Sequence, residues 1–383
     1  LTFLNLIVVR GILVGLIEGS VIANRDRHSS NVLLTVLRDK NFIENSAEIV
    51  SYVKSLPMTE EVSERYVANG KLESGYKTKL GKNDTPDYIN AQVSGIDPDQ
   101  EDHLTNLRSY VIKGEYLSGD DDNYVMVGSS LLFNYTAIEQ AGATPLKDVD
   151  AGDKVRLTVG GKTIEVTIKG VLKGKVDEVD RRVIMNDKKL RQMIGRNDLN
   201  VAEIAIKVKP GYTDEDLKLA ITNQGFERFA KIQTSSEAVP KFVKDISLTF
   251  SILGNVIGSI GLAVATITIF IVIFVNAITR RKYIGILKGI GVSSSAIEIS
   301  YVFQALFYAI TGIAVGIVIV FLVIKPYFDA NPIDFPFSDG ILVASLGDVM
   351  IRAVVLIFAT IISGFLPARL IVKQNTLDAI LGR

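Results

Sequence analysis

Residues 246–279, ISLTFSILGNVIGSIGLAVATITIFIVIFVNAIT, form a run of 34 residues without a charge or a proline, and the basic segment RRKYIGILKGIG (residues 280–291) follows at once. About 20 apolar residues in a helix cross the hydrocarbon core of a bilayer. At about 1.5 Å per residue this run extends roughly 50 Å. We therefore expect residues 241–279 to form a stalk and a membrane helix that projects beyond the lipid.

The charges that follow this run predict which side of the membrane its end faces. The loop at 280–297 has one acidic residue close by, Glu298, against four basic residues, Arg280, Arg281, Lys282 and Lys288. Cytoplasmic loops carry an excess of Lys and Arg. The loop is therefore expected in the cytoplasm, and the other end of the helix outside.

Apolar residues and glycines stand among these charges. They are Ile284, Gly285, Ile286, Leu287, Gly289, Ile290, Gly291 and Val292. A solvated loop has no reason to carry such a short amphipathic segment, whereas a helix that presses into a groove of a partner protein does. We expect a docking element; the alternative is a helix lying at the lipid interface.

The composition excludes several kinds of function. The 383 residues have a mean hydropathy of +0.30 and a formal net charge of zero, so nothing indicates a nucleic-acid partner. There is no Cys, and two His, His28 and His103, are too few for a histidine-based metal or acid–base centre. The motifs of nucleotide-binding loops, zinc proteases and serine hydrolases do not occur. We expect a non-catalytic membrane protein that binds no cofactor or metal itself.

Two further regions precede the helix expected at residues 241–279. Residues 1–23 are expected to be the first membrane helix, and because its opening apolar run is short, we expect the sequence to begin partway through that helix, whose missing start faces the cytoplasm. Residues 24–240 have the composition of a soluble α+β domain on the outer side. We expect this domain to have two subdomains with a boundary near residues 110–124.

Local patterns within the outer domain predict individual elements. Apolar residues alternate at 155–159 and at 164–168 around Gly160-Gly161, which predicts a hairpin. The acidic stretch Asp97-Pro98-Asp99-Gln100-Glu101-Asp102 resembles the start of a calcium loop, but Asp102 stands where that loop requires Gly. No calcium site is therefore expected.

The remaining chain completes four spans. A third span is expected at 298–325, an acidic, proline-rich outer loop at 326–348, a fourth span at 349–366 ended by Pro367, and a cytoplasmic tail at 367–383. The predicted fold class is a membrane protein of four transmembrane α-helices, both termini in the cytoplasm, with a large extracytoplasmic α+β domain between helices 1 and 2. Small residues at close helical spacing predict helix packing or a dimer contact at Gly254, Gly258, Gly261, Gly312 and Gly316.

Residues 280–291 resemble the coupling stretch R-R-x-E-I-G-I-L-K-A-x-G of the FtsX-like permeases of ABC transporters, in particular the MacB and LolC/LolE branch. Tyr283 departs from this pattern, because the family usually has Glu there. Essentially the whole chain is similar to the family. Its supporting motifs are Gly95-Ile96-Asp97-Pro98, Gly170-Val171-Leu172, Pro367-Ala368-Arg369 and Leu377-Asp378-Ala379-Ile380.

The resemblance implies partners and a mechanism. It implies a permease homodimer or heterodimer in a bacterial inner membrane or archaeal cell membrane. This dimer would be bound to cytoplasmic ABC ATPase subunits, which bind ATP and Mg. An extracytoplasmic adaptor or accessory protein and the membrane lipid are the further partners that the resemblance implies. It implies mechanotransmission, in which closure of the ATPases moves the outer domains through the second helix. The implied ATPase-coupling residues are Arg281, Ile284, Gly285, Ile286, Leu287, Lys288, Gly289 and Gly291.

Three functions stay open at this point. The first is export or extraction of a lipid-like, peptide or drug-like substrate. The second is an FtsX-like regulator that relays ATPase strokes to cell-wall enzymes and transports nothing, and the third is a free-standing receptor. The outer segment of roughly 215 residues favours the first, because the family's pure regulators usually have a smaller one.

Overall fold

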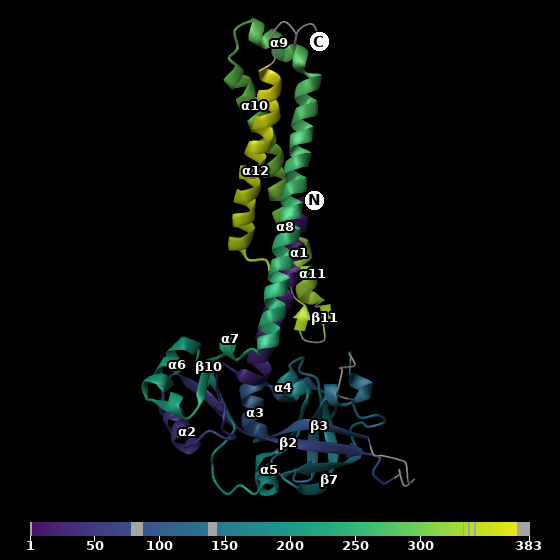
Figure 1. Ribbon diagram of the computed structural model, residues 1–383, viewed down its shortest axis with the longest axis vertical. Helices are drawn as coiled ribbons and strands as arrows, with labels where there is room; N and C mark the ends of the chain where they lie inside the picture. The colour runs from purple at the N-terminus through teal and green to yellow at the C-terminus, as the bar shows by residue number, and fades with distance from the viewer. Residues whose placement is uncertain are drawn as a thin grey trace. The chain divides into compact units, whose positions relative to one another are not determined.

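The computed structural model (Figure 1) describes residues 2–77, 87–136, 144–331, 333–335, 338–340 and 342–373. The chain divides into two compact units. The helical unit comprises Leu1–Glu18, Phe242–Asp334 and Gly340–Arg383, and the α+β unit comprises Gly19–Lys241 with Phe335–Asp339. The motif at 377–380 and most of the expected tail lie outside the described residues.

Four described helices are long and apolar enough to cross a membrane. They are α1 (Thr2–Asn24), which continues into the π-helical turn η1 (Arg25–Ser29), α8 (Lys241–Thr279), α10 (Ser294–Ile319), which continues through η6 (Val320–Ile324) and α11 (Lys325–Ala330), and α12 (Leu346–Val372). The short helix α9 (Arg281–Gly289) joins α8 to α10, and the strands β11 (Ile333–Phe335) and β12 (Ser338–Gly340) precede α12. The predicted fold class, four spans with an α+β domain between the first two, is confirmed.

The fourth span does not end at Pro367, as expected, but runs on to Val372. An internal proline removes one backbone hydrogen bond and usually breaks a helix. Membrane helices tolerate it where neighbouring helices hold the turn. Here Ala368 and Ile371 are buried in a cluster with residues of α8 and α10, so packing holds the last turn in place. The third span likewise begins earlier than expected, at Ser294, where Ser293 caps the helix.

The α+β unit contains one ten-stranded sheet in its described residues. Its strands are β1 (Val32–Thr35), β2 (Thr59–Ser74), β3 (Asp87–Ile96), β4 (Val111–Gly114), β5 (Tyr124–Gly128), β6 (Lys154–Val159), β7 (Lys162–Leu172), β8 (Arg182–Asn186), β9 (Glu203–Val208) and β10 (Lys231–Thr234). The order is β10-β1-β9-β2-β3-β8-β5-β7-β4, and β6 pairs with both β2 and β7. Strands β2, β3, β8, β5, β7 and β6 therefore close into a ring.

The long strand β2 belongs to both parts of this unit. Its first half pairs with β9 in the open part of the sheet, and its second half pairs with β3 in the ring. The expected boundary near residues 110–124 is wrong, because β4, which lies inside this stretch, and β5, which begins at its end, both pair with β7. The open part consists of β10, β1, β9 and the first half of β2. The chain enters the ring in the second half of β2 and returns to the open part at β9.

Short helices cover this sheet and connect its strands. The α-helices are α2 (Ser46–Ser55), α3 (Pro98–Thr105), α4 (Asp177–Asp180), α5 (Asp187–Ile194), α6 (Asp214–Asn223) and α7 (Ser235–Ala238), and the 3-10 turns are η2 (Leu107–Tyr110), η3 (Ser129–Leu131), η4 (Phe133–Tyr135) and η5 (Phe226–Arg228). The predicted hairpin is confirmed as β6 and β7. Its turn residues Gly160 and Gly161 have φ of 57° and 77°, which glycine adopts without strain.

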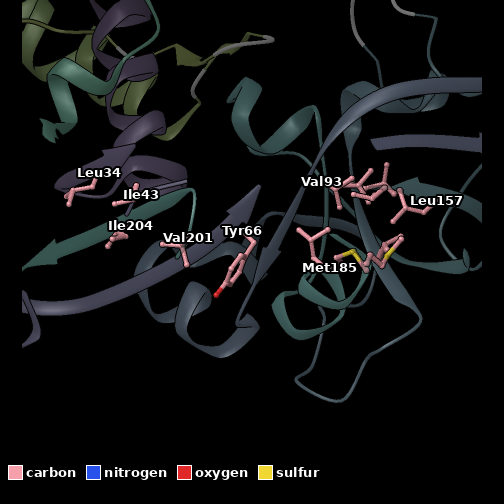
Figure 2. Packing of buried hydrophobic residues seen from close by; sticks show 14 of the residues in the cluster. Leu34, Ile43, Tyr66, Val93, Leu157, Met185, Val201 and Ile204 are labelled. Atoms are coloured by element: carbon pink, nitrogen blue, oxygen red, sulfur yellow. The ribbon is translucent and has the colours of Figure 1, made fainter. Parts of the chain in front are cut away.

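One hydrophobic core runs through both parts of the sheet. Figure 2 shows Leu34 and Ile204 at one end of this core and Leu157 at the other, with Tyr66 between them. Tyr66 lies near the middle of β2, so the same strand carries the core from the open part into the ring. The two parts are thus expected to fold as one unit.

Candidate functional site

Helix α9 is fixed to the ends of its neighbours in the helical unit (Figure 1). Ile284 is 4% exposed and packs in a cluster with Ala277 of α8 and Ile371 of α12. The Nζ of Lys288 donates a hydrogen bond to the backbone oxygen of Val372 at 2.9 Å. The helix therefore has a defined orientation against α8 and α12.

The opposite side of α9 presents large apolar side chains to the outside of the chain. Tyr283 is 69% exposed, Ile286 43%, Leu287 41% and Ile290 73%. Residues three and four apart in a helix share a side, so these four form one continuous face. We call Tyr283, Ile286, Leu287 and Ile290 the α9 face. Contiguous exposed apolar side chains of this kind mark an interaction surface.

The structure divides the eight predicted coupling residues between two sides of this helix. Ile284 and Gly285 are buried against the bundle, and Arg281 and Lys288 are half-buried. Ile286, Leu287, Gly289 and Gly291 are exposed, and Gly291 has a φ of 96° that suits the turn into α10. Tyr283 and Ile290, which were not among the eight, complete the exposed face. Contact with an ATPase stays a prediction for all eight residues.

The predicted packing glycines lie at different places in the helical unit. A Cβ built on Gly254 would be 3.4 Å from Cγ of Arg10, one on Gly258 would be 3.8 Å from Nη1 of Arg352, and one on Gly316 would be 2.6 Å from Cδ1 of Phe3. Gly261 is half-buried, and a Cβ on Gly312 would meet no described atom within 4 Å. Three of the five therefore face neighbours within the chain, and a dimer contact stays a prediction.

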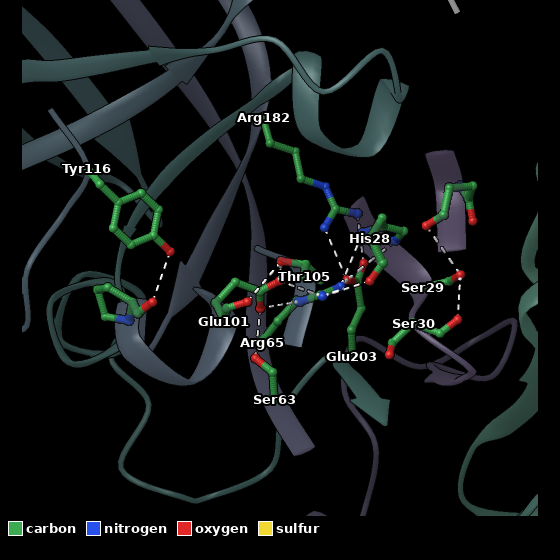
Figure 3. A network of polar contacts seen from close by, with 12 residues as sticks. His28, Ser29, Ser30, Ser63, Arg65, Glu101, Thr105, Tyr116, Arg182 and Glu203 are labelled. Carbon is green, nitrogen blue, oxygen red and sulfur yellow. Dashed lines mark hydrogen bonds and ion pairs between the residues drawn. The ribbon is translucent and has the colours of Figure 1, made fainter. Parts of the chain in front are cut away.

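A buried ionic cluster in the α+β unit was not predicted from the sequence (Figure 3). Arg65 of β2 donates from Nε and Nη2 to the two carboxylate oxygens of Glu101 at 2.8 and 2.7 Å. Its Nη2 also donates to the backbone oxygen of His28 in η1 at 2.7 Å. Arg65 therefore ties the turn that follows α1 to β2 and α3.

A second arginine extends this cluster to two more strands. Arg182 of β8 donates to both carboxylate oxygens of Glu203 in β9, at 3.1 and 2.7 Å. Burial alone raises the pKa of Glu203, but the charges of Arg182 and Arg65 outweigh it and hold that pKa well below its ordinary value. Burial lowers the pKa of His28, so this imidazole is neutral at pH 7. The cluster holds two arginines against two carboxylates.

No sequence signal identifies these partners. Arg65 and Glu101 are 36 positions apart, and Arg182 and Glu203 are 21 apart, in different elements. The acidic stretch that begins at Asp97 serves the fold: Asp97 caps α3 by accepting from the N–H groups of Asp99 and Gln100. Among the described residues, no group of three or more His, Asp or Glu side chains is placed to hold a metal ion.

Two protein-family models match the chain. The model of the MacB-like periplasmic core domain matches residues 11–224, and the model of the FtsX-like permease C-terminal region matches residues 255–376. The first covers the second half of α1 and most of the α+β unit. The second covers most of α8, then α9, α10 and α12.

Individual proteins are similar over parts of the chain. An uncharacterized ABC transporter permease of Methanocaldococcus jannaschii is 27% identical over 169 residues, 44% of this chain and 45% of that protein. Another from the same organism is 25% identical over 252 residues, 62% of this chain and 59% of that protein. The chain thus spans about half the length of these relatives. The crystal structure of the periplasmic region of MacB from Actinobacillus actinomycetemcomitans has 13% identity and a TM-score of 0.36, and the match covers 54% of this chain and 90% of that one.

Proposed function

This chain belongs to the family of ABC transporter permeases with FtsX-like and MacB-like domains, and we propose that it is the membrane subunit on which a separate cytoplasmic ATPase docks. The α9 face is the docking surface. The basic residues beside it, Arg280, Arg281, Lys282 and Lys288, favour a position in the cytoplasm. The chain carries no nucleotide-binding motif of its own. In this proposal ATP and Mg bind to the ATPase partner.

One observation carries this proposal. The α9 helix buries Ile284 and exposes Tyr283, Ile286 and Leu287 on its other side, and Ile290, the residue directly after the helix, is exposed as well. A helix that lay in the lipid interface would need no fixed orientation against the bundle, but Lys288 and Ile284 hold α9 against α12. A fixed apolar face beside basic residues suits insertion into a groove of a protein partner.

Helix α8 supplies the route by which the ATPase acts on the α+β unit. It is one unbroken helix of 39 residues, roughly 60 Å long. It begins at Lys241, where the α+β unit ends, and its last residue, Thr279, is two positions before α9. A movement of α9 on ATP binding is therefore passed to the α+β unit outside the membrane. We propose that two copies of this permease assemble, and that the movement exports or extracts a lipid-like, peptide or drug-like substrate.

Replacement of one exposed leucine tests the docking. Leu287→Asp places a charge in the α9 face and should abolish co-purification of an ATPase that carries a nucleotide-binding loop, together with ATP hydrolysis by the complex. Leu219→Asp, on the exposed side of α6 in the α+β unit, is the matched control and should leave both unchanged. An intact ATPase complex with Leu287→Asp would refute the proposal.

A further inference from the structure

Two arginines stand in the apolar spans of the helical unit, apart from the α9 face. Arg10 belongs to α1 and Arg352 to α12, and both line one small cavity of about 20 Å³. Charged side chains in membrane spans are costly and usually mark a functional site. The cavity lies wholly in the helical unit, and its existence does not depend on ATPase docking. It is therefore a candidate ligand site.

The two helices that carry these arginines are tied together beside the cavity. The backbone N–H of Val343, just before α12, donates to the backbone oxygen of Gly11 in α1 at 3.1 Å. Both residues belong to the wall of the cavity. Arg10 directly precedes Gly11, so this bond holds the arginine of α1 close to the start of α12.

The neighbouring helix α8 indicates the depth of the two arginines in the membrane. A Cβ built on Gly254 would be 3.4 Å from Cγ of Arg10, and one on Gly258 would be 3.8 Å from Nη1 of Arg352. Thr279, the last residue of α8, is 21 positions after Gly258, which is about 32 Å of helix. The hydrocarbon core of a bilayer is about 30 Å thick. With the end of α8 at one edge of this core, the arginines lie near the other edge, at the level of the lipid phosphates.

The charges of the two arginines are not matched within the chain. Neither guanidinium forms a hydrogen bond or an ion pair with any residue that the structure describes. Both side chains are half-buried, and none of their nitrogens is among the sealed atoms that lack a partner, so a ligand can reach them. Asp348, also in the cavity wall, accepts instead from Oγ of Ser345 at 3.0 Å. Two positive charges against one negative charge favour an anion at this site.

We propose that Arg10 and Arg352 bind the phosphate group of one membrane phospholipid. The planar guanidinium groups donate to phosphate oxygens in pairs. The cavity has room for about one oxygen atom, so one phosphate oxygen enters it and the rest of the headgroup stays outside. Val355, three residues after Arg352 on the same side of α12, is 46% exposed and supports an acyl chain. This contact with the chain distinguishes a phospholipid from a free phosphate ion.

Three ligands test the requirement for both a phosphate and an acyl chain. In native mass spectrometry of the full chain in detergent micelles, phosphatidylglycerol should bind roughly 10-fold or more tightly than diacylglycerol with the same acyl chains. Inorganic phosphate in excess should not displace the bound phosphatidylglycerol. Equal binding of the two lipids, or displacement by inorganic phosphate, overturns the proposal.

Neutral variants show whether the two arginines are responsible. Arg10→Gln and Arg352→Gln should each weaken the binding of phosphatidylglycerol roughly 10-fold or more. Lys325→Gln is the control, because Lys325 lies outside the cavity wall and its charge is matched by Asp329 at 2.8 Å. Undiminished binding in both arginine variants, or an equal loss in Lys325→Gln, contradicts the proposal.

A measurement on the unaltered chain covers the case in which the arginine variants do not melt cooperatively. Phosphatidylglycerol that carries a photoreactive diazirine in its headgroup is bound to the full chain and illuminated. The peptides that contain Arg10 or Arg352 should carry the label, and excess unlabelled phosphatidylglycerol should remove it. Labelling that is confined to other peptides overturns the site.

Discussion

At the scale of single residues, Arg65 is the buried charge on which most of the ionic cluster depends. Its guanidinium contacts Glu101, Glu203 and the backbone oxygen of His28, and its side chain is almost fully buried. A buried ion pair adds little when intact, but removing one partner leaves the other charge without compensation. Arg65 is therefore expected to matter for stability far more than any surface arginine.

Replacing Arg65 measures this dependence. Arg65→Met should lower the free energy of unfolding by about 3–5 kcal/mol, because Glu101 is left buried and unpaired. Arg108→Met, which breaks the exposed pair with Asp102, should cost less than about 1 kcal/mol. Thermal unfolding of both variants checks this, and similar losses in the two would show that burial of the cluster is not what matters.

Asp180 gives a pH dependence with a defined sign. Burial raises the pKa of its carboxyl to about 6, although the backbone N–H of Gly174 donates to it. The stability that the neutral carboxyl contributes is present below pH 4, where the unfolded chain is also protonated, and it is lost as the pH rises through 6.

Asp180→Asn should therefore stabilise the protein at pH 7 by about 1–3 kcal/mol and change it little at pH 4. The measurement is the melting temperature of both proteins at the two pH values. Asp122→Asn, at an exposed turn, is the control and should show no such difference between them. A stabilisation by Asp180→Asn that is equal at pH 4 and pH 7 would contradict the assignment.

At the scale of helices and strands, two glycines of α10 form a matched pair. A Cβ on Gly316 would meet the ring of Phe3 in α1, whereas one on Gly312 would meet open space among the described atoms. Alanine is intrinsically favoured over glycine in a helix by about 1 kcal/mol.

Gly316→Ala should therefore lower the melting temperature of the full chain, and Gly312→Ala should leave it unchanged or raise it. Both are measured by thermal unfolding in nanodiscs. The opposite order would mean that α1 does not pack on α10 as described. If Gly312→Leu weakens a permease dimer without lowering the melting temperature of the single chain, then Gly312 belongs to the contact between copies.

The sequence was informative wherever a structure depends on neighbouring residues. Gly160-Gly161 between alternating strands specifies a hairpin by local geometry alone. Pro367 was misjudged because its effect depends on packing against α8 and α10, which no local pattern encodes. The ring of strands and the Arg65–Glu101 pair depend on contacts between distant segments.

At the scale of the whole molecule, the proposed transmission of movement requires α8 to connect the two units as a continuous helix. A flexible four-residue insertion between Pro240 and Lys241 should leave ATPase docking and ATP hydrolysis intact. It should abolish the changes in hydrogen–deuterium exchange that ATP causes in the α+β unit. The same insertion after Gly211, in an exposed turn, is the control. If ATP still alters exchange across the α+β unit with the first insertion, α8 is not the relay.

The most direct test of the central claim is a site-specific cross-link from the α9 face. The sequence contains no Cys, so single cysteines can be placed at will. In native membranes, Leu287→Cys should cross-link to a protein that carries a nucleotide-binding loop, and Ile284→Cys, buried on the other side of α9, should not. Labelling of Leu287→Cys by lipid reagents alone, with no second polypeptide attached, would contradict the account.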